Sequence, residues 1–244
     1  MATTLSRRER VRAATVAEIK ETARRILVAE GPDGLSLRAI AREMGMTAPA
    51  LYRYFPSRED LVIALIADLY DELTEALEAA RDGEAEAGAP FQLGAASREF
   101  RGWALANRRE FELLFGSPIP GRGEDEDDDD PAHQASERFG LIFGGLVARI
   151  YLDDPFPIPA DEEIPPELRQ ELETWRSWFP VELPLGAAQV FLSCWIQLYG
   201  MVAMEVFGHL RFALSDAEPM FESELRDLAT KLGFADKYPP SPPP

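Results

Sequence analysis

The segment from Leu35 to Phe55, LSLRAIAREMGMTAPALYRYF, constrains the fold more than any other part of the chain. Its apolar residues recur at helical spacing before and after a three-residue turn, Gly45-Met46-Thr47. Gly45 can adopt the left-handed conformation that ends a helix, and Pro49 falls in a first helical turn, where its missing N–H costs nothing. The segment therefore predicts two short helices joined by a tight turn. Their predicted ranges are 37–44 and 48–54, with Ser36 and Thr47 as N-caps.

The rest of the chain also repeats at helical spacing, and no run of alternating, β-branched residues predicts a strand. A helix of about 15–30 comes before the pair of short helices. A longer helix follows the pair, with Ser57 as its N-cap, and it carries leucines at every fourth position to about Arg81. Beyond a linker at 82–89, further helices are predicted at 90–107, 108–116, 133–153, 166–177, 185–210 and 217–232. The predicted fold class is therefore all-α.

The charge distribution supports a division of the chain into regions. The net charge is −18, but residues 1–60 hold 11 Lys and Arg against 8 Asp and Glu, whereas the other 184 residues hold 14 against 35. A net charge of +3 at one end of an acidic body is by itself weak evidence for a nucleic-acid partner. The predicted regions are a three-helix domain at 1–60 with a basic arm at 1–14, a larger helical domain at 61–236, and a proline-rich tail at 237–244.

The two short helices have the pattern of a helix-turn-helix, whose second helix enters the major groove of DNA. Ile40, Met44, Leu51 and Phe55 are expected to pack inward, which leaves the outer face of 48–54 for base edges. Arg38 can reach a guanine edge or a phosphate, and groups at the helix ends can hold phosphates. The predicted DNA-binding residues are Arg38, Thr47, Ala48, Pro49, Tyr52, Arg53, Tyr54 and Arg58. The arginines of the arm, predicted to contact phosphates or the minor groove, are Arg7, Arg8, Arg10 and Arg12.

From about Val16 to Leu65 the chain resembles the DNA-binding domain of the tetracycline-repressor (TetR) family. The resemblance rests on the run 23–31, LSLRAIA at 35–41, GMT at 45–47 and LYRYFPSREDL at 51–61. Tyr54 stands where the family often has histidine, and Arg58 where it often has lysine, and both keep a donor for phosphate. The resemblance implies a homodimer that binds a palindromic operator in double-stranded DNA, with one motif per half-site.

Aromatic residues concentrate after residue 90, and most are expected to form ordinary helical core. Large flat side chains also line cavities that bind small ligands, and the TetR resemblance implies an effector site in the C-terminal domain. The candidates for binding a small apolar or aromatic effector are Trp103, Phe143, Trp195 and Tyr199. The segment 195–200, with Glu205 and His209 beyond it, resembles the Trp-His-Gly (WHG) subgroup of that domain, with Tyr199 in place of the histidine.

Dimerisation is predicted to use the last two long helices, 185–210 and 217–232, packed on the same helices of a second subunit. Small residues that would allow close approach are Gly186, Ala187, Ala188, Gly200 and Ala203. The stripe expected to face the partner is Phe221, Leu225, Leu228 and Leu232. Such a stripe is more often core within one chain, and it is the family resemblance that favours an interface.

The sequence disfavours a membrane protein. Residues 184–204 carry no charge and are long enough to span a bilayer, but Gln189, Ser193 and Gln197 form a polar line along one face. That line indicates a core or interface helix. A single cysteine, Cys194, and the lack of a secretory signal fit a reducing cytoplasm, where the thiol is expected to be buried and inert.

No phosphate-binding loop, nucleophile elbow or catalytic carboxylate pattern is present, so neither an enzyme nor a cofactor is predicted. Glu205 and His209 lie four residues apart, but a metal site is disfavoured because the chain has only one other histidine, His133. The seven consecutive acids at 124–130 predict a solvated loop rather than a cation site or a DNA mimic.

The leading interpretation is a ligand-responsive repressor that an effector releases from its operator. The alternative from another class is a helical enzyme or small-molecule carrier whose helix-turn-helix pattern is accidental. A third possibility is a regulator that activates transcription or answers to a protein partner. The effector, the operator, the target genes, the role of the acidic loop and the oligomer on DNA stay open.

Overall fold

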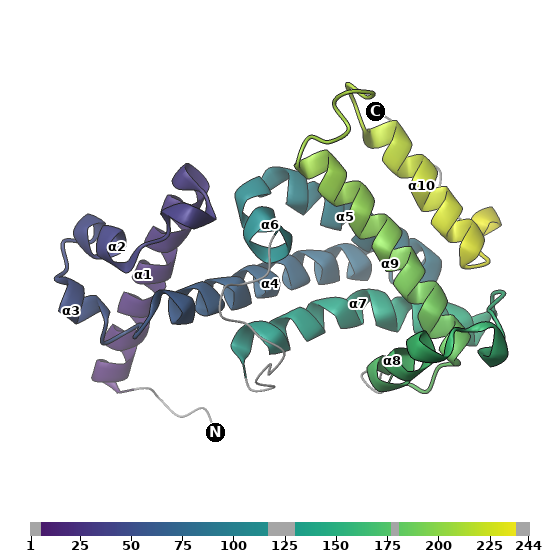
Figure 1. The fold of residues 1–244 in the computed structure, drawn as a ribbon, viewed down its shortest axis with the longest axis horizontal. Coiled ribbons are helices and arrows are strands. Elements are labelled where there is room, and N and C mark those ends of the chain that lie inside the picture. The colour runs from purple at the N-terminus through teal and green to yellow at the C-terminus, as the bar shows by residue number, and fades with distance from the viewer. Residues whose placement is uncertain (1–5, 117–129, 177–180, 238–244) are drawn as a thin grey trace. The chain divides into compact units, whose positions relative to one another are not determined.

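The structure is a computed structural model that describes residues 6–116, 130–176 and 181–237. Every regular element in these ranges is helical, which confirms the all-α fold class (Figure 1). The α-helices are α1 (Arg7–Glu30), α2 (Leu37–Glu43), α3 (Ala48–Leu51), α4 (Arg58–Gly83), α5 (Ala89–Ala106), α6 (Arg108–Phe115), α7 (Pro131–Asp153), α8 (Pro166–Arg176), α9 (Leu185–Val206) and α10 (Glu218–Lys231). The 3-10 helices are η1 (Pro32–Gly34), η2 (Asp161–Glu163) and η3 (Ala235–Lys237). The acids at 124–129 and the tail from 238 lie outside the described residues.

The helices gather into two compact units. The first unit comprises Met1–Glu72 and Asn107–Glu137, and the second comprises Leu73–Ala106 and Arg138–Pro244. Because these divisions fall inside α4 and α7, each of the two helices contributes residues to both units. The first unit therefore differs from the predicted domain 1–60, since it also takes in the start of α4, all of α6 and the start of α7.

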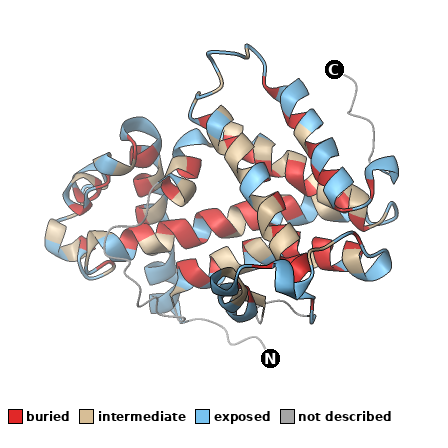
Figure 2. Ribbon diagram, turned by 45° about the vertical axis from the view of Figure 1, so that its right-hand side comes forward, coloured by how far each residue is buried: buried red, intermediate tan, exposed pale blue. Residues whose placement is uncertain are grey.

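In the first unit, α1, α2 and α3 share a core of aliphatic side chains. Ile19 and Leu27 of α1, Ile40 of α2 and Leu51 of α3 are fully shielded from solvent. Helix α4 follows, and its leucines at every fourth position, Leu61 to Leu77, are all buried; Figure 2 shows this helix buried along much of its length. Helical spacing of apolar residues thus predicted the inward faces correctly.

Helix α1 begins at Arg7, eight residues before its predicted start. The Ser6 amide donates to the Glu9 carboxylate (2.7 Å) and the Glu9 amide donates to the Ser6 hydroxyl (3.2 Å), which makes a capping box. Hydrogen bonds from the Ser6 side chain and then its backbone lower the pKa of the Glu9 carboxyl. The prediction of a basic arm ahead of the first helix is therefore wrong, because this cap carries the helix through Arg7, Arg8, Arg10 and Arg12. The Ser-x-x-Glu spacing at 6–9 was a readable signal for it.

The second unit has an aromatic core. Phe100 of α5, Phe139 and Phe143 of α7, and Trp195 of α9 lie with their ring centroids 5.5–6.1 Å apart, in tilted and edge-to-face pairs. Such pairs add to the free energy gained from burying the rings. Elsewhere in the unit, Trp175 of α8 stacks on Phe191 of α9, with centroids 5.5 Å apart. Aromatic contacts thus join α5, α7, α8 and α9.

Two arginines of α5 connect it to the last two helices. Arg98 donates through two nitrogens to the carboxylate of Glu222 on α10, at 2.7 and 2.9 Å. Arg101 donates in the same way to Glu205 of α9, at 2.7 Å for both bonds. The Glu205 hydrogen bonds raise the pKa of Arg101. These paired bonds fix the facing sides of α5, α9 and α10, because a planar guanidinium matches a carboxylate in one geometry only.

Helix α9 is long and apolar enough to cross a membrane by length and composition alone, a test that core helices of soluble proteins also pass. It packs against α5, α8 and α10, and Figure 1 shows α10 beside it. Two of the three residues of its predicted polar line face α10, where Lys231 donates to Gln197 (2.9 Å) and Ser193 (3.4 Å). The line therefore has a packing role within the chain.

Candidate nucleic-acid interface and effector cavity

The turn between α2 and α3 is closed by backbone hydrogen bonds. Gly45 has φ = 66°, the Met46 amide donates to the Ala41 carbonyl (2.8 Å), and the Gly45 amide donates to the Arg42 carbonyl (3.2 Å). This is the Schellman pattern that ends a helix at a left-handed glycine. Ala41 is buried, so a small side chain lies where the helices approach. The turn predicted at 45–47 is confirmed.

Helix α3 is shorter than predicted, since it covers Ala48–Leu51 rather than 48–54. The chain continues in tight turns, with the Tyr54 amide donating to the Leu51 carbonyl (2.8 Å) and the Phe55 amide to the same carbonyl (3.1 Å). Phe55 is buried, and Pro56 disfavours helical backbone at the residue before it. The segment 48–55 is therefore compact throughout, but its backbone is α-helical only as far as Leu51.

The three predicted N-caps behave differently. Ser36 and Thr47 occupy N-cap positions, but neither side chain makes a capping hydrogen bond. At Ser57 the hydroxyl accepts from the Asp60 amide (3.0 Å), and the Ser57 amide donates to the Asp60 carboxylate (2.9 Å). The Thr47 hydroxyl lies on an exposed residue at the start of α3, where a hydroxyl can donate to a phosphate.

The outer face of the helix-turn-helix is open to solvent. Tyr52 is 44% exposed, and Arg38, Thr47, Pro49 and Arg53 are exposed as well. Ala48 and Tyr54 are half-buried. This face holds the predicted base-contacting side chains next to a closely packed core, the arrangement that a reading helix requires.

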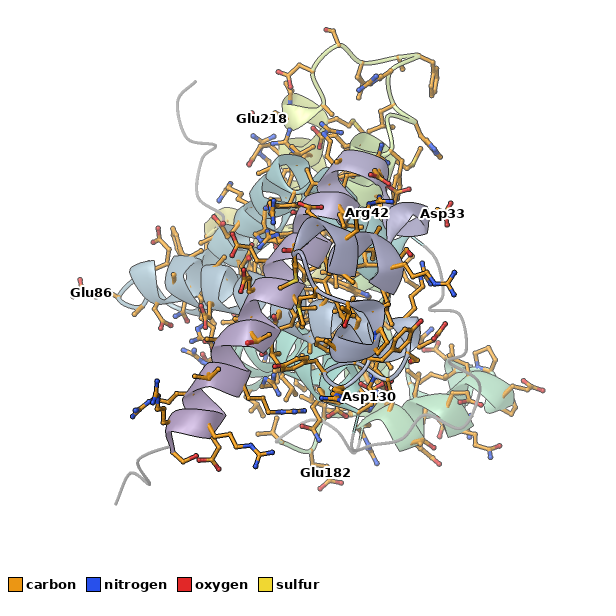
Figure 3. All side chains as sticks on the ribbon, turned by 90° about the vertical axis from the view of Figure 1, so that its left-hand side faces the viewer. Asp33, Arg42, Glu86, Asp130, Glu182 and Glu218 are labelled. Carbon is orange, nitrogen blue, oxygen red and sulfur yellow. The ribbon has the colours of Figure 1, made fainter. Side chains whose placement is uncertain are left out.

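Arg42 belongs to the same surface and was not among the predicted residues. It lies one helical turn after Arg38 on α2 and is exposed (Figure 3). The four-residue spacing, which places both side chains on one face of the helix, was the sequence signal.

Arg58 and Tyr54 have partners within the first unit. The Arg58 guanidinium donates to the carbonyls of Leu35 (2.9 Å) and Pro32 (3.0 Å), so it holds the start of α4 to the loop before α2. The guanidinium of Arg12 lies over the Tyr54 ring, 5.3 Å from its centroid. A phosphate contact by Arg58 stays a prediction, and its observed bonds are structural.

Arg24 joins α1 to two other helices of the first unit. It donates to Glu72 of α4 (Nη2 to Oε1, 3.1 Å) and to Glu110 of α6 (Nε to Oε1, 3.1 Å). Hydrogen bonding to Glu72 is the main cause that raises the pKa of Arg24. Glu110 is buried, so removal of Arg24 would leave a carboxylate without its cation.

The second unit has a cavity of about 40 Å³, partly open to solvent, between α5, α7, α9 and α10. Phe143 and Trp195, two of the four predicted effector residues, line it together with Leu93, Ser97 and Leu198, and effector contacts by them stay a prediction. No charged side chain lines it among the described residues, and the Ser97 hydroxyl donates to the Leu93 carbonyl (2.8 Å). The lining favours a neutral, apolar ligand.

The other two predicted effector residues do not line this cavity. Trp103 is buried elsewhere in the unit. Tyr199 is half-buried and stacks on Trp195, with centroids 6.0 Å apart, and burial raises the pKa of its hydroxyl. Tyr199 therefore supports the cavity residue Trp195 from one helical turn further along α9, without lining the cavity itself.

Cys194 lines the cavity, a role that was not predicted from the sequence. Burial raises the pKa of its thiol to about 11, which fits the predicted inert, buried cysteine. The available signal was its spacing, since Phe191, Cys194 and Leu198 recur at three and four residues and share one face of α9.

The stripe on α10 that was predicted to face a second subunit is buried within its own chain. Phe221, Leu225, Leu228 and Leu232 are all shielded from solvent, and the last three line the cavity. That prediction is wrong, because the cavity wall uses this face of α10.

The small residues also divide between two roles. A side chain at Gly186 would meet the Pro159 carbonyl at 2.3 Å, and Ala187 and Ala188 are buried, so these three serve packing within the chain. By contrast, Gly200 has open space around it.

The side of α9 that carries Gly200 is apolar and exposed. Ile196 (60% exposed), Met204 (44%) and Phe207, directly after the helix, recur on this side, and Met220 of α10 is exposed as well. Only a third of the most apolar stretch of α9 is buried by its own chain. A face of this kind is typical of an interaction surface.

A metal site finds no support in the described part of the chain. No three His, Cys, Asp or Glu side chains gather there in a group that could hold an ion. Glu205, one of the two residues considered, is paired with Arg101.

Two family models match this chain. Residues 19–65 match the model described as bacterial regulatory proteins, tetR family, and residues 93–228 match the model described as Tetracyclin repressor-like, C-terminal domain. The second match alone covers more than half of the chain.

Relatives match over most of their length. The HTH-type transcriptional regulators Rv1816 of Mycobacterium tuberculosis (strain ATCC 25618 / H37Rv) and Mb1846 of Mycobacterium bovis are each 34% identical over 228 residues, which is 88% of this chain and 91% of each relative. The crystal structure of SCO4313 is 31% identical, with a TM-score of 0.71 over 92% of this chain and 100% of its own. A protein from Rhodococcus sp. RHA1, 24% identical over 88% of this chain and 95% of its own, has a TM-score of 0.57 and shares the fold.

Proposed function

The chain belongs to the TetR family of transcriptional regulators, and on this basis we propose that it is a repressor that binds a palindromic operator as a homodimer and leaves it when a small-molecule effector binds. Members of this family are transcription regulators rather than enzymes, so the alternative of a helical enzyme is set aside. The observation that carries the proposal is the exposed outer face of α2 and α3 on a closely packed three-helix core.

Base reading is assigned to the outer face of the helix-turn-helix. Tyr52, Arg53 and Pro49 would meet base edges in the major groove, with Ala48 beside them. Arg38 and Arg42, one turn apart on α2, would contact a guanine edge or the backbone. Thr47 and Tyr54 would hold phosphates through their hydroxyls.

The proposed effector is a neutral apolar or aromatic molecule that contacts Phe143 and Trp195. The cavity of about 40 Å³ has room for only a few waters, at about 10–15 Å³ each by the same measure. An effector must therefore displace part of the wall, and α10 supplies Leu225, Leu228 and Leu232 to it. This makes α10 the helix expected to move when the effector enters.

The proposed dimer interface is the exposed side of α9. A twofold axis would bring Ile196, Met204 and Phe207 of one subunit against the same residues of the other, and Gly200 would allow the two helices to approach. Exposed Met220 would place α10 at the edge of this interface.

Helix α4 is the proposed link between effector and DNA. Its 26 residues correspond to about 39 Å of continuous helix, and they contribute to both compact units. A change in the direction of α4 would alter the separation of the two half-site readers. To turn a 1:99 population of DNA-competent dimers into 99:1, the effector needs about 5.5 kcal/mol of differential affinity.

Two finer assignments belong to the same proposal. The C-terminal domain is assigned to the WHG type with Tyr199 in place of the histidine, supported by the spacing of Trp195, Tyr199 and Gly200. The protein is assigned to the cytoplasm, supported by its regulator relatives and by its single, buried cysteine.

The test begins with selection of bound duplexes from random DNA by the purified full chain, and continues with a screen of neutral apolar metabolites for release of the selected operator. We expect palindromic sites and a protein dimer on each. Arg38→Ala and Tyr52→Phe should each weaken operator binding by about 1–3 kcal/mol, which is roughly 5- to 150-fold, and leave effector binding intact.

Arg211→Ala is the control, because Arg211 is an exposed arginine of the second unit, and its loss should not change operator affinity. If effector-saturated and effector-free dimers bound the operator equally well, the proposed release mechanism would be contradicted. Failure of the wild-type chain to bind any duplex would contradict DNA binding itself.

A further inference from the structure

The first two turns of α1 have no core beneath them. The helix begins at Arg7, yet its first buried side chain is Ile19, and all residues from Ser6 to Ala14 are exposed. At 1.5 Å per residue, Arg7 lies about 18 Å along the helix from Ile19. The Ser6–Glu9 capping box holds this end of the helix without help from packing. These turns, Arg7–Arg12, are called the N-terminal extension below.

The N-terminal extension carries all of the net positive charge of the predicted DNA-binding domain. Residues 7–12 hold four arginines and one acid, a net charge of +3. Residues 13–60 hold seven basic and seven acidic side chains, so they are neutral overall. The net positive charge that attracts this domain to a polyanion at long range therefore lies on six exposed residues of one helix.

Several cations nearer the core already have partners in the first unit. Lys20 pairs with Asp68, Arg24 with Glu72, and Arg25 with Glu43. Within the described residues, the arginines of the extension make no ion pair with a carboxylate; their one aromatic contact is that of Arg12 with Tyr54. Their guanidinium groups can thus bind an external anion without breaking a pair.

The extension lies on the same side of the first unit as the end of the reading segment. The Arg12 guanidinium is 5.3 Å from the centroid of the Tyr54 ring, which connects α1 to the turn that follows α3. Arg8 precedes Arg12 by one helical turn and shares its face of α1. A duplex read by α3 would therefore run close to these arginines.

We propose that the N-terminal extension is a second DNA contact, which binds phosphates beside the half-site and supplies most of the salt-dependent attraction to DNA. The inference rests on the proposed function, since it adds a contact to the same duplex. Guanidinium groups bind phosphate oxygens in a planar, two-point geometry, and such contacts position a protein without reading sequence. Arg12 has the additional role of positioning the Tyr54 ring.

The test measures affinity of the full chain for a selected operator and for a random duplex between 50 and 200 mM salt. The variant is Arg8→Gln with Arg10→Gln, which leaves the Arg12–Tyr54 contact in place. Two charges per subunit are four per dimer, and each lost phosphate contact reduces the slope of log K against log salt by about 0.9. We expect a slope shallower by up to about 3.6 and an equal loss of affinity for both duplexes.

Two further variants isolate the cause. Arg8→Lys with Arg10→Lys keeps the charge and should keep the slope. Arg211→Gln with Lys237→Gln removes two exposed charges from the second unit, and it should also leave the slope of log K against log salt unchanged. Circular dichroism of each variant checks that α1 still folds.

An unchanged slope in the Arg8→Gln, Arg10→Gln variant, with wild-type operator binding intact, would overturn the inference and leave the proposed function standing. A larger loss for the operator than for random DNA would also overturn it, because the contact would then read sequence. If the wild-type chain bound no duplex, the proposed function would fail first.

Discussion

Arg38 and Arg58 are arginines close to the same helix-turn-helix, yet their surroundings give them different roles. Arg38 is exposed at the start of α2, whereas Arg58 donates to the carbonyls of Leu35 and Pro32. A guanidinium that satisfies buried or half-buried carbonyls cannot leave them without cost. At the scale of single residues, a phosphate contact would therefore cost Arg58 more than it would cost Arg38, because Arg58 would have to give up these bonds.

Cys194 is a residue whose reactivity follows from burial. Burial raises the pKa of its thiol to about 11 from 9.0, and Lys231 opposes the shift. The thiolate fraction at pH 8 is then about 100-fold below that of an unperturbed cysteine. We expect iodoacetamide to alkylate Cys194 at least about 100-fold more slowly in the folded chain than in urea, with the product followed by mass spectrometry.

The same shift has a consequence for stability. The folded state favours the neutral thiol, so the stability that depends on this group is complete below pH 9 and is lost as the pH rises towards 11. This loss of stability can be measured from the midpoints of urea unfolding at pH 8, 9.5 and 11. The midpoints of the wild-type chain are compared with those of Cys194→Ala. If the wild-type midpoint did not fall relative to the variant over this range, the burial of Cys194 would be in doubt.

At the scale of elements, the turn between α2 and α3 depends on one backbone angle. Gly45 has φ = 66°, a conformation that costs other residues about 1–2 kcal/mol, while the space around an added Cβ is open. Gly45→Ala should therefore lower the free energy of unfolding by about 1 kcal/mol through backbone strain alone, as measured by urea denaturation.

Gly102→Ala is the matched control. Gly102 lies within α5, also has open space around an added Cβ, and does not adopt the left-handed conformation. The substitution should leave stability unchanged or raise it by up to about 1 kcal/mol, because alanine restricts the unfolded chain. Equal losses at the two positions would show that the left-handed angle of Gly45 is not what matters.

Helices α9 and α10 show how two apolar elements divide their roles. The leucines of the α10 stripe line the cavity, so the apolar face of that helix is buried within its own chain. Helix α9 carries aromatic core residues on one side and leaves Ile196 and Met204 exposed on another. The interface proposed here therefore centres on α9.

At the scale of the whole molecule, the proposed operator binding requires a second subunit. Ile196→Glu combined with Met204→Glu places charges on the exposed side of α9, which should prevent dimerisation because a twofold axis brings like charges together. We expect a monomer in sedimentation velocity and operator affinity lower by roughly tenfold or more, since one half-site contact is lost.

Leu152→Glu provides the control for this prediction. Leu152 is 58% exposed, close to the 60% of Ile196, and also belongs to the second unit, but it lies on α7. This variant should stay dimeric and bind the operator normally. A dimeric Ile196→Glu, Met204→Glu protein would move the interface away from α9.

Local order was readable from the sequence. The presence of each helix, the turn at Gly45 and the inward faces of α1 to α4 depend on neighbours within a few residues, where helical spacing, glycine and proline act directly, whereas the start of α1 and the end of α3 differ from the predicted ones. The Ser6–Glu9 cap is also local and was readable, although the predicted basic arm ignored it. The resemblance over 16–65 led to the correct family.

The partner of each face was decided by the tertiary structure. Nothing near Leu228 in the sequence tells whether its stripe meets a second subunit or the chain's own cavity, and nothing near Arg58 points to carbonyls 23 and 26 residues away. The position of Cys194 in the cavity wall likewise depends on how α9 packs against elements far away in the sequence. Periodicity determines that a face is apolar, but only the packing of distant elements determines what covers it.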